Sequence, residues 1–176
     1  MQLQLIHTTD TVHYAFVEKL LINSFPPNEY RDLTDFRLFT DDNLLFHNNI
    51  ILEKDKLIGF LSYWDFVDFY YVEHFAIEES MRGKGYGAFS LFLLKRIVNI
   101  PIVLEVEPPI NHEALRRIRF YRRQGFKLWN NYYEQPPYRP TDKPYPMLLM
   151  VYGGLNSETD FNRVKQTIYR EVYNIK

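Results

Sequence analysis

The sequence predicts an α/β fold of the α+β kind: a mixed, mostly antiparallel sheet with one parallel pair, flanked by helices and followed by a C-terminal helix. Strand-like segments succeed one another at residues 44–52, 57–66 and 70–77, which is typical of an antiparallel meander. A glycine-rich loop then leads into an apolar helical run and a further strand, and such a crossover connects parallel strands. Near the C-terminus, apolar residues recur at helical spacing.

The chain begins with a short strand followed by two helices. Residues 2–7 have the composition of a strand, and Asp10 can cap the helix that follows. That helix ends near Pro26, because proline does not continue a helix. Residues 28–39 form a second short helix, since prolines readily precede one. The face of the first helix that we expect to be buried comprises Val12, Phe16 and Leu20.

The meander comes next. Its first two strands, residues 44–52 and 57–66, form a hairpin that turns at residues 53–56, where Glu-Lys-Asp-Lys interrupts the apolar pattern. Residues 70–77, rich in aromatic and β-branched side chains, form the third strand.

The run of residues 82–87, Arg-Gly-Lys-Gly-Tyr-Gly, joins this third strand to a helix that begins near Ala88. Three glycines in five residues let the backbone approach an anion closely and permit positive φ. The N-terminus of the following helix offers unpaired N–H groups and the positive end of its dipole. Arg82 and Lys84 add positive charge. The loop therefore predicts a phosphate site, against the alternative of an ordinary strand-to-helix turn.

The stretch after the loop alternates between helix and strand. The first helix ends at Pro101, strand 102–106 follows, and a second helix over 111–124 is closed by Gly125 as C-cap. A short strand then begins at residues 126–129. The apolar faces comprise Ala88, Leu91, Leu94 and Val98 in the first helix and Ala114, Ile118 and Tyr121 in the second.

The last part of the chain predicts a loop, a strand and a helix. Residues 130–146 are rich in Tyr and Pro and should form one long loop, and loops of this length are often functional. Residues 147–152 return as a strand. Asn156 or Ser157 caps the final helix. Its apolar stripe comprises Phe161, Val164, Ile168, Val172 and Ile175.

The composition describes one folded domain. With 176 residues, 46% of them apolar, the chain can bury one core, and we expect a single domain over 1–176 with residues 156–176 as a helical extension. The formal net charge of -1 argues against a general nucleic-acid binder. The lack of cysteine excludes disulfides and thiolate nucleophiles, and no stretch approaches the ~18 apolar residues of a membrane span. We expect a cytoplasmic protein without a membrane partner.

Two motifs together carry a family resemblance. Residues 82–87 match the pattern of Arg or Gln, two residues, Gly, one residue, and Gly or Ala, and residues 120–126 contain Phe-Tyr, three residues and Gly-Phe. With this order of elements, most of the chain resembles the GCN5-related N-acetyltransferase (GNAT) superfamily, and its flanking sequences are similar to a bacterial subgroup of unassigned acceptor. One departure is Ala114, where many relatives carry an Asn seven residues before the tyrosine.

The resemblance implies an N-acetyltransferase that moves an acetyl group from acetyl-CoA to a primary amine of a small molecule or peptide by direct transfer, without a metal. It also implies that the pyrophosphate lies on the main-chain amides of the loop and that the pantetheine arm runs beside the end of the preceding strand. The residues it assigns to acetyl-CoA are Phe75, Ala76, Ile77, Arg82, Gly83, Lys84, Gly85, Tyr86, Gly87 and Ala88.

Such a transfer needs a base, because an alkyl amine has a pKa of about 10.4. Glu73 is the leading candidate: it lies in an aromatic strand, where we expect burial to raise its pKa. The alternative is that it faces solvent or makes a structural hydrogen bond. Glu105 is the second candidate, at the C-terminal end of a parallel strand, where ligands favour binding. With Glu107 it would otherwise be a charged face at a strand end.

Tyr121 could protonate the departing thiolate, since its reference pKa of about 10 lies only slightly above the thiol's 8.5 or so. The alternative is a core tyrosine with a satisfied hydroxyl. A main-chain N–H freed by a bulge near Phe75 would stabilise the oxyanion. His74 should face the side of the sheet opposite Glu73 and be structural.

Further charged and aromatic residues surround these candidates. The helix over 111–124 bears five arginines that could meet the 3′-phosphate of the coenzyme or form a solvated face: Arg116, Arg117, Arg119, Arg122 and Arg123. Residues 24–31 would wall the acceptor pocket, together with Tyr132, Tyr133, Tyr138 and Arg139. Nearby acidic residues, Glu29, Asp32 and Asp35, hint at a cationic amine.

Other classes of protein compete with the acetyltransferase. Gly83, Gly85 and Ala88 fit a dinucleotide fingerprint, but an antiparallel meander precedes them and too few residues follow for a nicotinamide-dependent oxidoreductase. No Gly-Lys-Ser or Gly-Lys-Thr completes a Walker loop. The remaining alternative is a non-catalytic acyl-CoA-binding sensor or assembly module, whose amphipathic last helix would form a homodimer surface.

Overall fold

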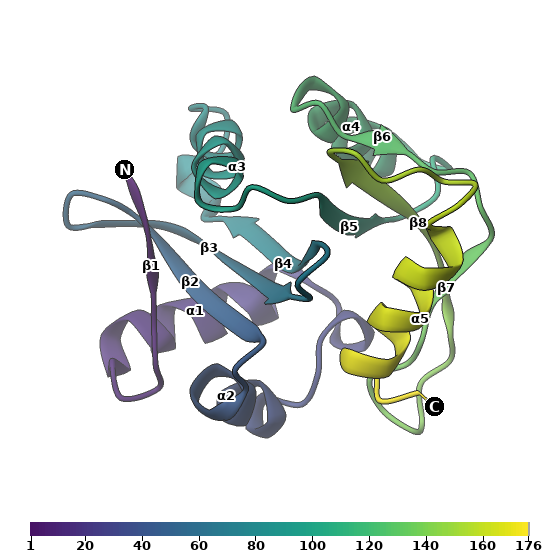
Figure 1. The fold of residues 1–176 in the computed structure, drawn as a ribbon. Coiled ribbons are helices and arrows are strands. Elements are labelled where there is room, and N and C mark those ends of the chain that lie inside the picture. Colours follow the sequence, from purple (N-terminus) through teal and green to yellow (C-terminus); the bar gives the residue numbers. More distant parts are fainter. Residues whose placement is uncertain (176) are drawn as a thin grey trace. The chain divides into compact units, whose positions relative to one another are not determined.

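A computed structural model describes residues 1–175 of the chain and divides them into two compact units (Figure 1). Unit 1 comprises Met1–Asp65 and Val72–Asn99, and unit 2 comprises Phe66–Tyr71 and the chain from Ile100 onward. How many domains the chain forms stays a prediction. No helix among residues 1–175 combines the length and apolar character that crossing a membrane requires.

The predicted fold class is confirmed. Eight strands form a mixed, mostly antiparallel sheet in the order β1-β2-β3-β4-β5-β8-β6, with β7 paired to β8. The parallel pair consists of β4 and β5, and within unit 2 the N–H of Tyr70 donates to the carbonyl of Pro101 at 2.8 Å. In unit 1, α1 and α2 cover one face of the strands and α3 the other (Figure 1).

The elements have the following bounds. Up to the glycine loop they are β1 (Gln2–Leu5), α1 (Thr11–Ser24), the 3-10 turn η1 (Pro27–Glu29), α2 (Leu33–Asp42), β2 (Phe46–Glu53), β3 (Lys56–Asp65), β4 (Tyr70–Ile77) and the 3-10 turn η2 (Glu79–Met81). After the loop they are α3 (Tyr86–Ile97), β5 (Ile102–Val106), α4 (His112–Arg123), β6 (Lys127–Leu128), β7 (Tyr133–Gln135), β8 (Tyr145–Tyr152) and α5 (Phe161–Glu171).

Helix α1 begins as predicted but buries a different face. Asp10 caps it by accepting from the N–H of His13. Val12, however, is 70% exposed. The buried residues are Tyr14, Val17, Leu20 and Leu21. Apolar side chains lie on several sides of this helix, so the four-residue spacing of Val12, Phe16 and Leu20 did not identify the inner face.

The second predicted helix is interrupted. Residues 28–39 do not form one helix, because η1 ends at Glu29 and the backbone is extended at Tyr30 (φ -145°, ψ 153°) before α2 begins at Leu33. The extended break carries Arg31 inward, where only 4% of it is exposed. The sequence signal of a preceding proline was correct for η1 alone.

The predicted hairpin of unit 1 is confirmed. Strands β2 and β3 pair antiparallel up to Glu53 opposite Lys56, and Lys54 in the turn adopts a positive φ of 55°. Within β3, Gly59 lies against β4: a Cβ there would stand 2.3 Å from the carbonyl oxygen of Ala76. Only glycine allows the two strands to approach this closely at that point.

We therefore expect Gly59→Ala to destabilise the protein by about 1–3 kcal/mol, the usual cost of overpacking a well-packed interior. Urea unfolding measures this change. Gly154→Ala is the matched control, because a Cβ at Gly154 meets nothing within 4 Å. Equal stability of the two variants would contradict the close approach of β3 and β4.

In unit 2 the sequence identified α4 best. Asn111 caps it by accepting from the N–H of Ala114 at 2.8 Å, its buried residues are the predicted Ala114, Ile118 and Tyr121, and Gly125 follows it with a φ of 87°. The predicted loop over residues 130–146 is wrong in part, because it contains β7 and the start of β8.

Helix α5 begins later than predicted. The chain first forms a turn in which the N–H of Asp160 donates to the carbonyl of Asn156 at 2.9 Å. Asp160 then occupies the N-cap of the helix. Val164, Ile168 and Val172 are buried as expected, whereas Ile175 is 41% exposed.

Candidate active site

The glycine loop leaves β4 through η2 and enters α3 in unit 1. Gly83 and Gly85 adopt positive φ values of 76° and 83°, and Gly85 is the N-cap of α3. The helix begins at Tyr86, two residues before the predicted Ala88, so Gly87 is helical and needs no positive φ. The first N–H groups of α3 have no acceptor within their own helix. The loop thus has the backbone that an anion site requires.

The space above the loop is open. A Cβ added at Gly83 or Gly85 would meet nothing within 4 Å. The ammonium of Lys84 donates to the carbonyl of Ser80 at 2.8 Å, and the Nε of Arg82 donates to the carbonyl of Ile77 at 3.0 Å. Both cations therefore remain beside the loop. Backbone, charge and open space together fit a bound diphosphate.

A depression of about 380 Å³ adjoins this helix start within unit 1. The hydroxyl of Tyr86 donates to the carboxylate of Glu53 at its wall. Its lining residues are Met1, Glu53, Lys84, Gly85, Tyr86 and Phe89. The three residues assigned to the pantetheine arm lie at the end of β4, where Ala76 is buried and Phe75 and Ile77 are half-buried. Their contact with acetyl-CoA stays a prediction.

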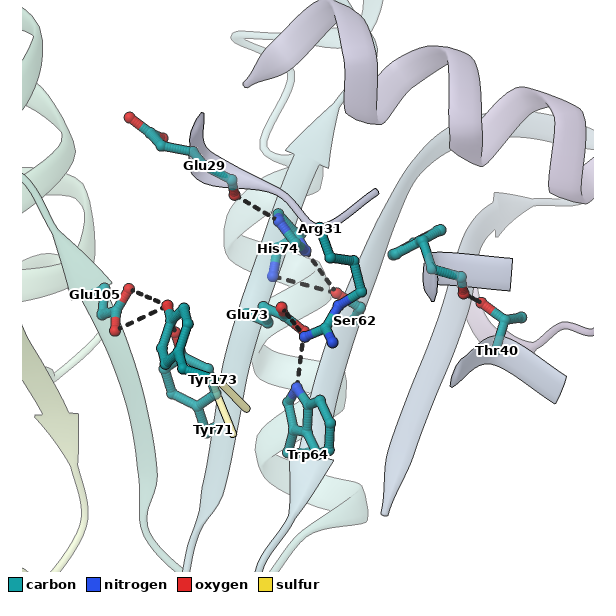
Figure 2. A network of polar contacts seen from close by, with 11 residues as sticks. Glu29, Arg31, Thr40, Ser62, Trp64, Tyr71, Glu73, His74, Glu105 and Tyr173 are labelled. Atoms are coloured by element: carbon teal, nitrogen blue, oxygen red, sulfur yellow. Dashed lines mark hydrogen bonds and ion pairs between the residues drawn. The ribbon is translucent and has the colours of Figure 1, made fainter. Parts of the chain in front are cut away.

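Glu73 is part of a buried network in unit 1 (Figure 2). Its carboxylate accepts from the Arg31 guanidinium at 2.6 Å and from the Trp64 indole at 2.7 Å. The Glu73 side chain is 0% exposed. The guanidinium also lies over the rings of Phe39, at 4.3 Å, and of Phe46, at 5.9 Å. Aromatic rings thus enclose the ion pair.

The expected pKa of Glu73 is wrong in direction. Burial by itself acts to raise the pKa of this carboxyl, but the Arg31 charge and the hydrogen bonds from Arg31 and Trp64 outweigh it and lower the pKa of Glu73. The aromatic strand suggested burial without a partner, and the sequence gave no sign that Arg31, 42 positions away, would supply one. A carboxylate with a lowered pKa accepts protons weakly.

His74 does not face away from Glu73. Ser62 and Trp64 lie two residues apart on β3 and therefore share one face. The ring of His74 contacts the Oγ of Ser62 at 3.3 Å, while Glu73 contacts Trp64, so both side chains reach that face. The main-chain N–H of His74 also donates to the Oγ of Ser62, at 3.2 Å.

His74 directly precedes Phe75, near which we expected a bulge, and the bulge stays a prediction. His74 also holds the turn before Arg31, since its Nε2 lies 3.0 Å from the carbonyl of Glu29. Burial lowers the pKa of His74, and its ring has two polar partners, as a structural histidine would. An N–H of Phe75 that stabilises an oxyanion stays a prediction.

Glu105 lies in unit 2 on β5, half-buried among tyrosines (Figure 2). The hydroxyl of Tyr133 donates to its Oε1, and that of Tyr173 lies 3.2 Å from its Oε2. Tyr71 extends the cluster, with its hydroxyl 3.5 Å from that of Tyr173. Glu107 is separate and forms an ion pair with Arg117. The predicted acidic pair thus divides into one surface ion pair and one carboxylate held by phenols.

Tyr121 is buried on the inner face of α4, in unit 2. Burial raises the pKa of Tyr121 to about 12. Proton transfer from this phenol to a thiolate of pKa about 8.5 would therefore cost about 5 kcal/mol, more than the slight cost expected from its reference value. The role of Tyr121 as the acid stays a prediction.

The arginines of α4 are all exposed (Arg116, Arg117, Arg119, Arg122 and Arg123). This agrees with a solvated helix face. A contact between any of them and a 3′-phosphate stays a prediction.

Three residues that organise these sites were not identified from the sequence. Arg31 was placed only in a segment near the acceptor, Tyr173 not at all, and Tyr71 only as part of a strand. Tyr173 and Glu105 stand 68 positions apart, and no local spacing links them. The one available signal was the density of tyrosines, 14 in 176 residues.

The chain superimposes on solved structures of acetyltransferases. A structure from Bacteroides thetaiotaomicron, assigned to the GNAT family of acetyltransferases, is 49% identical over 100% of both chains, with a TM-score of 0.97. The sequence profile of the Acetyltransferase (GNAT) family matches residues 12–126. No curated protein matches the sequence.

More distant structures share the fold. An aminoglycoside 6′-N-acetyltransferase complexed with coenzyme A is 17% identical, with a TM-score of 0.62, over 86% of this chain and 96% of that one. Naa50 of Arabidopsis thaliana, in complex with a bisubstrate analogue of coenzyme A and a peptide, is 16% identical, with a TM-score of 0.59, over 87% and 98%.

The chain belongs to the GNAT acetyltransferase family. As a member of this N-acetyltransferase family, it is an acyltransferase that transfers an acetyl group from acetyl-CoA to an amine. The predicted family, activity and co-substrate are thereby confirmed, and the oxidoreductase and sensor alternatives are not supported. Among residues 1–175, no three His, Asp or Glu side chains gather as a metal site would need.

Proposed function

We propose that the enzyme acetylates a primary amine of a small molecule or peptide and that Glu105, rather than Glu73, removes the amine proton. The observation that carries this choice is the contrast between the two carboxylates. The Glu73 side chain is 0% exposed and forms an ion pair with Arg31, whereas Glu105 is half-exposed and accepts hydrogen bonds from the phenols of Tyr133 and Tyr173. A general base must be accessible to its substrate.

The chemistry assigns a task to each group. Acetyl-CoA supplies an activated acetyl carbonyl, held by its diphosphate at the amides of Gly83 to Ala88. The amine nitrogen forms the new C–N bond while the C–S bond breaks. Glu105 accepts the proton that the amine loses, directly or through a water. The thiolate of coenzyme A takes up a proton, for which Tyr121 remains the candidate donor.

The acceptor, the assembly and the location belong to the same proposal. The carboxylate of Glu105 and the surrounding tyrosine rings suit a cationic amine. A homodimer, a cytoplasmic location and the absence of nucleic-acid or membrane partners stay predictions.

Binding of acetyl-CoA tests the loop. We expect calorimetry to show acetyl-CoA binding to the wild type and roughly 5- to 30-fold weaker binding to Gly85→Val, because a β-branched residue at a φ of 83° costs about 1–2 kcal/mol and about 1.4 kcal/mol is tenfold in affinity. Gly154→Ala, outside the loop, should bind like the wild type. Unchanged affinity of Gly85→Val would exclude the loop as the diphosphate site.

Turnover tests the activity. A panel of aminoglycosides, short peptides with free α-amino groups and alkyl diamines, each with acetyl-CoA, should release free thiol for at least one class. Binding of acetyl-CoA without thiol release from any amine would instead support the non-catalytic acyl-CoA module.

A further inference from the structure

The carboxylate of Glu105 has hydrogen-bond donors on both of its oxygens, all within unit 2. Tyr133 of β7 donates to Oε1. Tyr173, just after α5, lies 3.2 Å from Oε2 and 3.4 Å from Oε1. Two phenols from separate parts of the chain, one on β7 and one after α5, therefore contact the carboxylate.

We propose that Tyr173 and Tyr133 are positioning residues that hold the Glu105 carboxylate oriented and ionised for the reaction. The proposal rests on the proposed role of Glu105 as the base. It makes the residues that follow α5 part of the active site, although they lie outside the region that the family profile matches, residues 12–126.

The phenols can only donate to this carboxylate. Burial, and then the charge of Glu105, raise the pKa of Tyr133 and of Tyr173 well above 10, so both keep their protons throughout the working range. A hydrogen bond to a carboxylate favours its charged form. Two further phenols belong to the same cluster: Tyr71, whose hydroxyl lies 3.5 Å from that of Tyr173, and Tyr169, whose pKa the charge of Glu105 helps to raise.

The surrounding structure holds Tyr173 in place. The preceding α5 residues Ile168 and Val172 are buried, and the ring of Tyr138 packs on that of Tyr173 with centroids 4.9 Å apart. One turn earlier, the hydroxyl of Tyr169 donates to the carbonyl of Glu134 at 2.6 Å. Tyr169 thus anchors the helix without bonding to the carboxylate, which makes it a matched control.

The test follows the titration of the Glu105 carboxyl carbon by NMR in protein labelled at glutamate, with the resonance assigned from Glu105→Gln. We expect Tyr173→Phe and Tyr133→Phe each to raise the titration midpoint by about one pH unit, because each removes a donor to the charged form. Tyr169→Phe should leave the midpoint at its wild-type position. Circular dichroism verifies that all three variants fold.

Kinetics then connect the carboxylate to the reaction. With the most active amine of the panel, the acid limb of kcat/KM should move upward with the NMR midpoint in Tyr173→Phe, while the KM for acetyl-CoA stays unchanged. An unchanged Glu105 midpoint in both Tyr173→Phe and Tyr133→Phe would overturn the proposal. A midpoint that moves while Glu105→Gln keeps full turnover would uphold the tyrosine–carboxylate link and remove Glu105 as the base.

Discussion

We expect Glu105→Gln to lower kcat by about 10²–10⁴-fold, the usual contribution of a general base. Glutamine keeps the shape of the side chain and can still accept from Tyr133, so folding should be preserved, but it cannot take a proton from the amine. The affinity for acetyl-CoA should not change. Thiol release at saturating acetyl-CoA, combined with calorimetry of acetyl-CoA binding, measures both quantities.

The neighbouring carboxylate provides the control. Glu107 lies two residues further along and forms a surface ion pair with Arg117, so Glu107→Gln should keep wild-type turnover. Equal kcat in Glu105→Gln and the wild type would remove Glu105 from the base role. A large loss of kcat in Glu107→Gln would instead indicate that Glu107 is the base.

The second large effect concerns stability. Arg31→Ala leaves the Glu73 carboxylate buried without its cation, and breaking a buried pair from one side typically costs about 3–5 kcal/mol. Urea unfolding at neutral pH should show this loss. Arg37 forms an ion pair with Glu18, and its side chain is 54% exposed. Arg37→Ala should therefore lower the free energy of unfolding by at most about 1 kcal/mol.

The pair also makes stability depend on pH. Because the pKa of Glu73 is lower in the folded protein than its unfolded value near 4.5, the stabilisation is complete above pH 4.5 and is lost as the pH falls through the folded pKa. Glu73→Gln should flatten this acid dependence. If Glu73→Gln instead lowered kcat and left stability unchanged, Glu73 would be catalytic and the structural interpretation would fail.

The sequence predicted correctly those elements whose apolar pattern identifies only one buried face or one turn. Helix α4 has arginines around three apolar positions, so its inner face was unambiguous, and the hairpin of β2 and β3 has one polar turn. In α1 the apolar residues surround the helix, and only packing against the sheet selects Tyr14 and Val17 over Val12.

The candidate site divides in the same way. The glycine loop could be predicted because its chemistry is local: the glycines and the helix start lie within a few residues of one another. The environments of the carboxylates could not, because they depend on partners far along the chain. Glu73 and Glu105 both lie in largely apolar strand segments of the sequence, yet Glu73 pairs with a guanidinium and Glu105 accepts from phenols. Pairing between residues far apart in the sequence sets these environments, and no local pattern encodes it.

The two tryptophans, both buried, fall one in each compact unit. Trp64 lies in unit 1 and bonds to Glu73, and Trp129 lies in unit 2 beside Phe161. Replacing either by phenylalanine leaves a single indole whose fluorescence reports the unfolding of its own unit. Coincident transitions in the two variants would mean one cooperative domain, and separate transitions would mean two. The chain therefore carries its own pair of optical reporters for the question of domain number.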